Sequence, residues 1–282
     1  MPFKDLLFAT FTYPDATPDR ALRSGVALGA RLGGKLTLIA TRIDLPELHH
    51  RLANALIDLD GMARDQEAQS AAAADRAAAC VAVAGEEAGV DAICLPHTAK
   101  LYEEGPGVST AARTRDLCLI AVGPAVAIGR SVAEAVLFGS GRPMIVFPEG
   151  VEVRPAPHFD TVAIAWDGGA RAARAVADAM PLLVQAAHVR VLVVTDEKPT
   201  TTAGGAADLL RHLEAHGVSS VVDETALGER DIGRALADYV TIHDVGLLVM
   251  GGFGHARARE FVLGGATRRM LEAPPCPILM SH

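Results

Sequence analysis

The sequence predicts an α/β protein of two successive units, each with a five-stranded parallel sheet flanked by helices. Short apolar runs alternate along the chain with longer segments of helical period, which is the pattern of repeated βαβ units. Half of the 282 residues are hydrophobic but only 4% are aromatic, so we expect a core made mainly of alanine, valine and leucine. This length and apolar content suffice for two domains of ordinary size.

The first half of the chain contains five apolar runs that we expect to be strands. Gly33-Gly34 stops one alanine-rich helical period and Gly89 stops another, as glycines at helix C-termini do. The expected strands are residues 6–9, 35–40, 92–95, 117–122 and 144–147, and the expected helices are residues 18–32, 63–87 and 111–115.

The second half repeats this order, and Gly217 ends one of its helical segments. The stretch 148–158 holds three prolines and no apolar period, so it predicts a boundary between a domain of residues 1–148 and one of residues 158–282. The expected strands are residues 162–165, 189–194, 220–222, 246–250 and 278–280, and the expected helices are residues 170–185, 206–216 and 232–242.

The spacing of glycines and prolines indicates an internal duplication with a local deletion. In each half a glycine ends the fourth apolar run and a proline precedes the fifth. Gly123 and Pro143 lie 20 positions apart, whereas Gly251 and Pro277 lie 26 positions apart. The first copy therefore lacks six residues directly after its fourth strand, and such a matched pair of anchors is hard to obtain by chance.

Charge and hydropathy exclude two classes of partner. The formal net charge is −8 and lysine and arginine do not cluster, so the sequence does not predict nucleic-acid binding. The most apolar stretch, residues 118–129, is interrupted by Gly123-Pro124 and is shorter than the roughly 20 residues that span a bilayer. The first residues run into a strand without a long apolar leader, so we expect a cytoplasmic protein without a membrane partner.

No metal site is predicted, and the cysteines are expected to be buried free thiols. No two cysteines form a CxxC pair, and three of the four lie in or beside apolar runs. His212 and His216 lie four apart on an expected helix, but this part of the chain lacks the pattern of a zinc protease. The cysteines are Cys80, Cys94, Cys118 and Cys276.

The six additional residues of the second copy fall within the clearest motif of the chain. Gly251-Gly252-Phe253-Gly254 is followed after nine residues by Gly264-Gly265-Ala266-Thr267. Glycines after a strand allow close approach of the backbone to a ligand, and the N-terminus of the helix that follows favours an anion. The spacing thus indicates a phosphate cradle; the competing interpretation is a glycine-rich turn that only reverses the chain.

The Gly-x2-Gly-x9-Gly pattern after Val-Met-Gly resembles the ATP-binding class of universal stress proteins. The resemblance continues into residues 269–279 and includes Asp167-Gly168-Gly169; it covers residues 161–282 well and residues 3–148 in outline. It implies tandem Rossmann-like domains of the adenine nucleotide alpha hydrolase-like type, with strand order 3-2-1-4-5. A ligand of such a sheet binds where the order reverses, outside the carboxyl ends of strands one and four.

The resemblance also implies the residues of an adenine-nucleotide site for ATP, ADP or AMP, with or without magnesium. Two residues depart from the family pattern: Gly265 replaces a usual serine or threonine, and Trp166 is bulkier than expected. His255 could donate to phosphate or be solvated in a polar loop. The implied site residues are Ala165, Trp166, Asp167, Val194, Gly251, Gly254, His255, Gly264, Gly265, Ala266 and Thr267.

The first half lacks these features, since no second glycine follows Gly123 and the first strand ends in Thr10-Phe11-Thr12. We therefore expect one nucleotide per chain, and an internal pseudo-dimer in which the fifth strands of the two halves pair; a homodimer of whole chains is a further expected assembly. The expected function is regulation in stress response. The alternatives are a slow ATPase or nucleotide-dependent transferase on the same fold, and an interaction module that binds no nucleotide.

Overall fold

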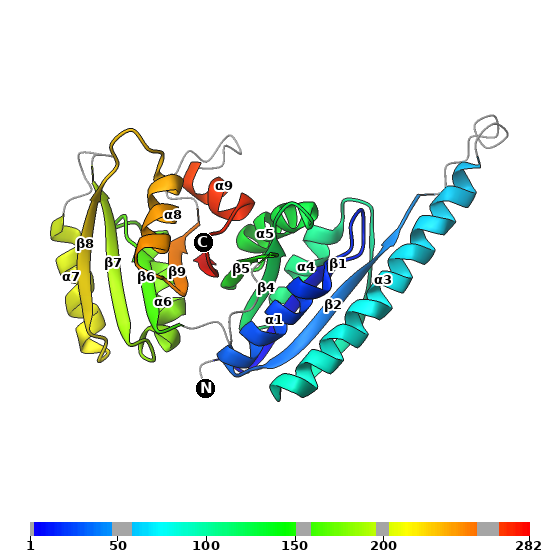
Figure 1. Ribbon diagram of the computed structural model, residues 1–282, viewed down its shortest axis with the longest axis horizontal. Helices are drawn as coiled ribbons and strands as arrows, with labels where there is room; N and C mark the ends of the chain where they lie inside the picture. The colour runs from blue at the N-terminus through cyan, green and yellow to red at the C-terminus, as the bar shows by residue number, and fades with distance from the viewer. Residues whose placement is uncertain (1–2, 47–57, 151–158, 196–202, 253–264) are drawn as a thin grey trace.

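The computed structural model describes residues 3–46, 58–150, 159–195, 203–252 and 265–282 (Figure 1). The strands are β1 (Asp5–Phe11), β2 (Lys35–Asp44), β3 (Ala92–Lys100), β4 (Leu117–Val122), β5 (Met144–Pro148), β6 (Thr161–Ala165), β7 (His188–Thr195), β8 (Ser220–Ala226), β9 (Leu247–Gly251) and β10 (Ile278–Ser281). The helices are α1 (Asp19–Leu32), α3 (Leu59–Ala88), α4 (Glu104–Ala112), α5 (Ala127–Gly139), α6 (Ala170–Leu183), α7 (Ala203–Ala215), α8 (Ile232–Ile242) and α9 (Gly265–Glu272).

All ten strands form one sheet of order β3-β2-β1-β4-β5-β10-β9-β6-β7-β8. We call β1 to β5 with their helices the first repeat, and β6 to β10 with theirs the second repeat. Each repeat is parallel and has the order 3-2-1-4-5, as the family resemblance implies. The two expected sheets are joined into one, because β5 and β10 pair antiparallel with Ile278 opposite Val146 and Met280 opposite Met144. The expected pairing of the fifth strands is confirmed.

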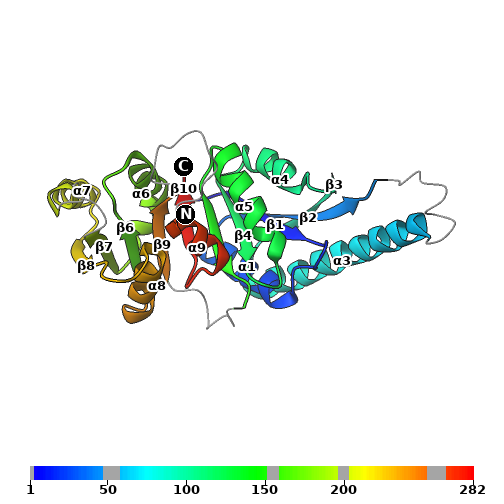
Figure 2. The same cartoon turned by 90° about the horizontal axis from the view of Figure 1, so that it is seen from above.

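Helices cover both faces of the sheet, since alternate side chains of a buried strand point to opposite sides. Leu6 and Phe8 of β1 join the core beneath α1, α3, α6 and α7, whereas Leu7 and Ala9 join the core beneath α4, α5, α8 and α9. Figure 2 shows the two repeats side by side along the long axis, with β10 at their junction. None of the described helices is both long and apolar enough to cross a membrane.

Two helices of the first repeat differ from the sequence prediction. The helix expected at residues 111–115 is wrong: α4 spans Glu104–Ala112, and α5 was not predicted. The Gly105-Pro106-Gly107 segment favours a loop by composition, but tertiary packing requires small residues here. A Cβ on Gly105 would lie 2.9 Å from Cβ of Ala135 on α5. Proline is tolerated in this position because the first helical turn needs no amide donor.

The expectation of buried thiols holds for only two of the four cysteines. Cys118 and Cys276 are buried, and burial raises the pKa of Cys276 to about 12. Cys80 is partly buried and Cys94 is exposed, so the prediction for Cys94 is wrong. The apolar run that contains Cys94 forms β3. This strand lies at the edge of the sheet, where an apolar side chain is not necessarily buried.

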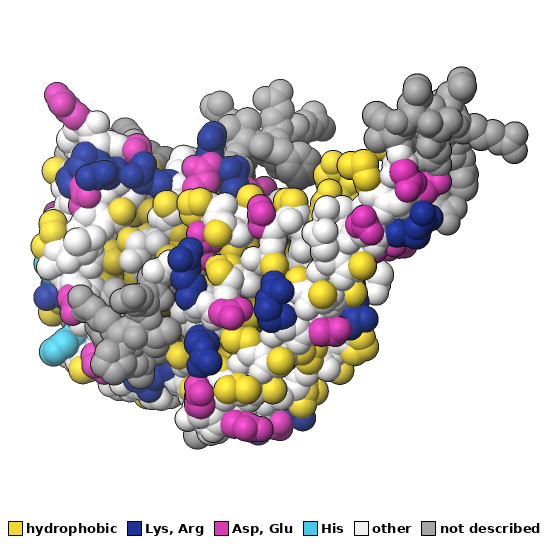
Figure 3. All heavy atoms as spheres, turned by 45° about the vertical axis from the view of Figure 1, so that its right-hand side comes forward, with side chains coloured by type: hydrophobic (Ala, Val, Ile, Leu, Met, Phe, Trp, Pro, Cys, Tyr) yellow, Lys and Arg dark blue, Asp and Glu magenta, His cyan; other side chains and the backbone are white. Residues whose placement is uncertain are grey.

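The surface carries acidic and basic side chains close to one another. Ion pairs such as Arg23–Glu87 and Arg42–Asp75 link α1 to α3 and β2 to α3. The face drawn in Figure 3 shows both signs of charge distributed among scattered hydrophobic side chains. This face differs from the one-sided basic surface of nucleic-acid-binding proteins.

The junction strand should support both repeats. Leu279 of β10 is fully buried opposite Ile145 of β5, so Leu279→Ala should lower the free energy of unfolding by about 2–5 kcal/mol. Val221→Ala on β8, where the side chain is 52% exposed, should change it by less than about 0.5 kcal/mol. Urea denaturation followed by circular dichroism measures both, and a loss below about 1 kcal/mol for Leu279→Ala would contradict the structural role of the junction.

Candidate functional site

The carboxyl ends of three strands meet at one edge of the second repeat. Ala165, the last residue of β6, is in register with Leu192 of β7 on one side and Met250 of β9 on the other. The strand order reverses here, because β7 and β9 lie on opposite sides of β6. We call the edge at Ala165, Leu192 and Gly251 the switch-point edge; it is where doubly wound sheets bind ligands.

The backbone of β7 extends past the end of β6 at this edge. The last ladder bond joins the Trp166 amide to the Leu192 carbonyl at 2.9 Å, but β7 continues to Thr195 in register with β8. Alternate residues of a strand direct their backbone groups to the same neighbour. The amide and carbonyl of Val194 therefore point in the same direction as those of Leu192, toward the space that β6 would occupy if it were longer. The Val194 side chain is buried in the core.

Asp167 lies at the start of α6. Its carboxylate Oδ1 accepts a hydrogen bond from the Gly169 amide at 2.8 Å, and the side chain is exposed. An acidic group at a helix N-terminus is stabilised by the helix dipole. Asp167 thus has a structural role in starting α6, and it also presents a carboxylate at the switch-point edge.

Trp166 connects the end of β6 to α7. Its indole Nε1 donates to the Gly205 carbonyl at 3.3 Å, and its ring packs partly buried against the core beneath α6 and α7. The Trp166 side chain, which is bulkier than the family pattern implies, therefore lies along α7.

The first motif glycine is required by packing, and the second contacts a side chain of the first repeat. A Cβ on Gly251 would lie 2.6 Å from the Ala172 amide nitrogen, so the first turn of α6 lies directly on the end of β9. A Cβ on Gly252 would lie 2.6 Å from Leu137 Cδ2 of the first repeat. The second glycine thus belongs to the junction between the repeats.

Helix α9 begins at a residue without a side chain. Gly265 is exposed, and no atom among the described residues lies within 4 Å of a Cβ placed on it. Ala266 is half-buried and Thr267 is buried, so Thr267 does not supply a surface hydroxyl in place of Gly265. The expected ligands Gly254, His255 and Gly264 lie outside the described residues.

Two residues beside the switch-point edge carry no local sequence signal. Arg171 Nε, in the first turn of α6, donates to His282 Nδ1 at 3.0 Å, and the same His282 nitrogen lies 3.2 Å from the Gly252 carbonyl. Arg171 and His282 are far apart in the chain, and only the fold brings them together. They place a guanidinium and an imidazole next to the glycine motif.

A sequence model of the universal stress protein family matches residues 158–282. Those residues form a universal stress protein domain. A comparison with curated protein sequences gives no significant match.

Solved structures extend the likeness in fold to the whole chain. A universal stress protein from Archaeoglobus fulgidus DSM 4304 superposes with a TM-score of 0.66 at 16% identity, covering 98% of this chain and 97% of its own. A putative universal stress protein from Pseudomonas aeruginosa UCBPP-PA14 gives a TM-score of 0.56 at 13% identity, covering 99% and 93%. The first repeat therefore shares the fold of the universal stress protein domain that follows it.

In the first repeat, the loop after β4 already holds an anion from the chain itself. Glu149, which follows β5, is buried, and its Oε1 accepts from the Ala125 amide at 2.8 Å. A Cβ on Gly123 would lie 2.6 Å from the Glu149 side chain. Arg20 of α1 lies 3.8 Å from the same oxygen. In the universal stress protein domain, the corresponding loop begins at Gly251.

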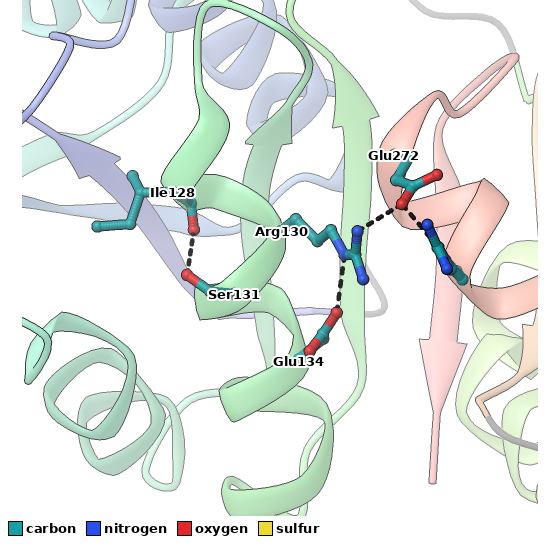
Figure 4. A network of polar contacts seen from close by, with 6 residues as sticks. Ile128, Arg130, Ser131, Glu134 and Glu272 are labelled. Atoms are coloured by element: carbon teal, nitrogen blue, oxygen red, sulfur yellow. Dashed lines mark hydrogen bonds and ion pairs between the residues drawn. The ribbon is translucent and has the colours of Figure 1, made fainter. Parts of the chain in front are cut away.

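Helix α9 of the universal stress protein domain is tied to α5 of the first repeat (Figure 4). Glu272 pairs with Arg130 across the junction and accepts from Arg268 Nε at 2.9 Å, and Arg130 also bonds Glu134 at 2.9 Å. Arg268 and Arg130 hold the pKa of Glu272 below its ordinary value. Exposed pairs contribute at most about 1 kcal/mol each, so this network chiefly orients α9.

The two ends of the glycine motif should respond differently to an added methyl group. Gly251→Ala should destabilise the protein by about 1–3 kcal/mol, because its Cβ would meet backbone atoms of α6. Gly265→Ala should change stability by less than about 1 kcal/mol, because its Cβ would enter open space. Denaturation of both variants measures the difference; equal losses would show that the motif is uniformly structural.

Proposed function

We propose that the universal stress protein domain binds one adenine nucleotide at the switch-point edge and acts as a nucleotide-dependent regulator in stress response. The observation that carries this proposal is the extension of β7 past the end of β6, which leaves the Val194 backbone without a ladder partner on the β6 side among the described residues. Gly265, which begins α9, is also exposed. Backbone groups and glycines at such an edge suit a ligand that must approach the main chain closely.

The phosphate end of the proposed site is the N-terminus of α9. Amides there lack partners within the helix, and the helix dipole favours negative charge. The glycine motif precedes this helix in the sequence. Arg171 adds a guanidinium next to Gly251, suited to charge-assisted bonds with phosphate oxygens.

The adenine end of the proposed site is the β7 extension. An amide and a carbonyl on one strand edge match the neighbouring acceptor and donor of an adenine edge, and Val194 directs both to the side of β6. Asp167 follows β6, the strand between β7 and β9, and its exposed carboxylate suits a ribose hydroxyl.

A nucleotide at α9 has a physical route to the junction. Helix α9 is held against α5 through Arg130 and Glu272, so a ligand that orders the start of α9 also bears on the contact between repeats. A ligand shifts a conformational equilibrium only by its differential affinity for the two states. We therefore assign regulation to this contact.

Restoring the family's hydroxyl should strengthen binding. We expect near one adenine nucleotide per chain, identified by mass spectrometry of the denatured protein. In calorimetric titrations of the full chain with ATP, Gly265→Ser should bind about 3–10 times more tightly than the natural protein, because a hydroxyl gains one phosphate hydrogen bond. Gly265→Ala is the matched control and should show no gain. A serine variant that behaves like the alanine variant would place the phosphates elsewhere.

The nucleoside side should depend on Asp167. Asp167→Ala should weaken ATP binding about tenfold, since a charge-assisted contact is lost. Asp160→Ala makes the same change in charge at the exposed residue just before β6, at the opposite end of that strand, and should leave affinity unchanged. Equal effects of the two substitutions would indicate a general electrostatic influence instead of a contact.

Catalysis should be slow. We expect phosphate release from ATP and magnesium at no more than about one turnover per minute, because the described part of the site offers no positioned general base. A phosphate-release assay under steady-state conditions measures this. Faster turnover that is lost in Asp167→Ala would favour the ATPase or transferase alternative.

A further inference from the structure

A cleft of about 530 Å³ opens in the first repeat between α4 and α5, next to the end of β1. Its walls come from the turn after β1, the turn between β3 and α4, and the outer side of α5, and Figure 2 shows α4 and α5 side by side. This volume lies within the range of small-molecule sites. The lining includes Tyr13, Leu101, Tyr102, Glu104, Pro106 and Ile128.

Glu104 is the chemically distinctive residue of this cleft. It is only 5% exposed, and its carboxylate has no hydrogen bond or ion pair with any residue that the structure describes. Its oxygens are not among the fully buried unpartnered atoms of the described residues, so the carboxylate stays open to the cleft and can take a cationic partner. The adjacent Glu103 is exposed, so the burial is specific to the residue that lines the cleft.

A smaller void lies behind the cleft. Tyr13 and Glu104 also line this void, against Phe11, Thr12 and Thr41. Thr41 Oγ1 is buried there without a hydrogen-bond partner. The void is too small for a water molecule, so the ligand-sized space is the cleft itself.

Aromatic residues are concentrated at the mouth. The chain contains three tyrosines, and Tyr13 and Tyr102 are two of them. Tyr102 has φ of 69°, a conformation that is unusual for a bulky residue, and its side chain is 86% exposed. Aromatic faces bind apolar groups and also attract organic cations.

We propose that this cleft binds a small organic amine, with an apolar body between Tyr13 and Tyr102 and a primary ammonium group on the Glu104 carboxylate. The ammonium group and the carboxylate would form a charge-assisted hydrogen bond. A carboxylate or phosphate ligand is disfavoured, because it would bring a second negative charge to Glu104. This site is in the first repeat and does not depend on nucleotide binding in the second.

Three indole compounds of similar size test the proposal by calorimetry on the full chain. Tryptamine carries an ammonium group, tryptophol a neutral hydroxyl, and indole-3-propionate a carboxylate. We expect tryptamine to bind with a Kd of about 1 mM or tighter, tryptophol at least about tenfold more weakly, and indole-3-propionate more weakly still. Equal affinities, preference for the carboxylate, or no tryptamine binding at about 10 mM would overturn the proposal.

Matched substitutions locate the site. Glu104→Gln should abolish the preference for tryptamine over tryptophol, whereas Glu103→Gln should leave that preference unchanged. The two residues are adjacent, and each substitution removes one negative charge. Ser131→Phe adds a ring to the cleft wall at a residue far in sequence from Glu104. It should weaken the binding of tryptamine and of tryptophol by about the same factor. Circular dichroism and thermal denaturation confirm folding of each variant. A preference that survives in Glu104→Gln would overturn the assignment.

Discussion

The antiparallel pairing of β5 with β10 is the interaction on which the rest of the molecule depends. A five-stranded parallel sheet leaves its outer strand with unpaired backbone groups, and such apolar edges associate. Here β5 and β10 supply each other with the backbone hydrogen-bond partners that each would lack at the edge of a separate sheet. Because the pairing is antiparallel, the strand order reads the same from both ends of the sheet, and helices of corresponding position cover the same face. One chain thereby adopts the arrangement of a dimer.

The two switch-point regions of this sheet have different chemistry although they share a fold. In the second repeat, Gly265 at the start of α9 is exposed, and Val194 of β7 lies beyond the last residue of β6 that pairs with β7 in the described part of the chain. In the first, the Glu149 carboxylate bonds the Ala125 amide and lies over Gly123. In the first repeat, the loop after β4 is six residues shorter, and a carboxylate from the chain itself lies on it.

The two repeats place different polar groups in the regions proposed as sites. The first repeat keeps a buried acidic residue, Glu104, at a cleft lined by aromatic and apolar side chains, which suits a cation. The second repeat keeps glycines and a helix N-terminus, which suit an anion. The shared sheet and the contact of α9 with α5 place the two regions in one packed structure.

The sequence by itself determined the βαβ alternation, the strand order through a family resemblance, and the asymmetry of the two glycine loops, because periodicity and spacing are local properties. Only the tertiary structure decided that α4 and α5 pack through Gly105, that Cys94 lies exposed on an edge strand, and that Glu149 fills the first loop. It also brought Arg171 to His282, which is 111 residues away. Such contacts depend on how helices and strands are placed in three dimensions, and no local pattern of residues records that placement.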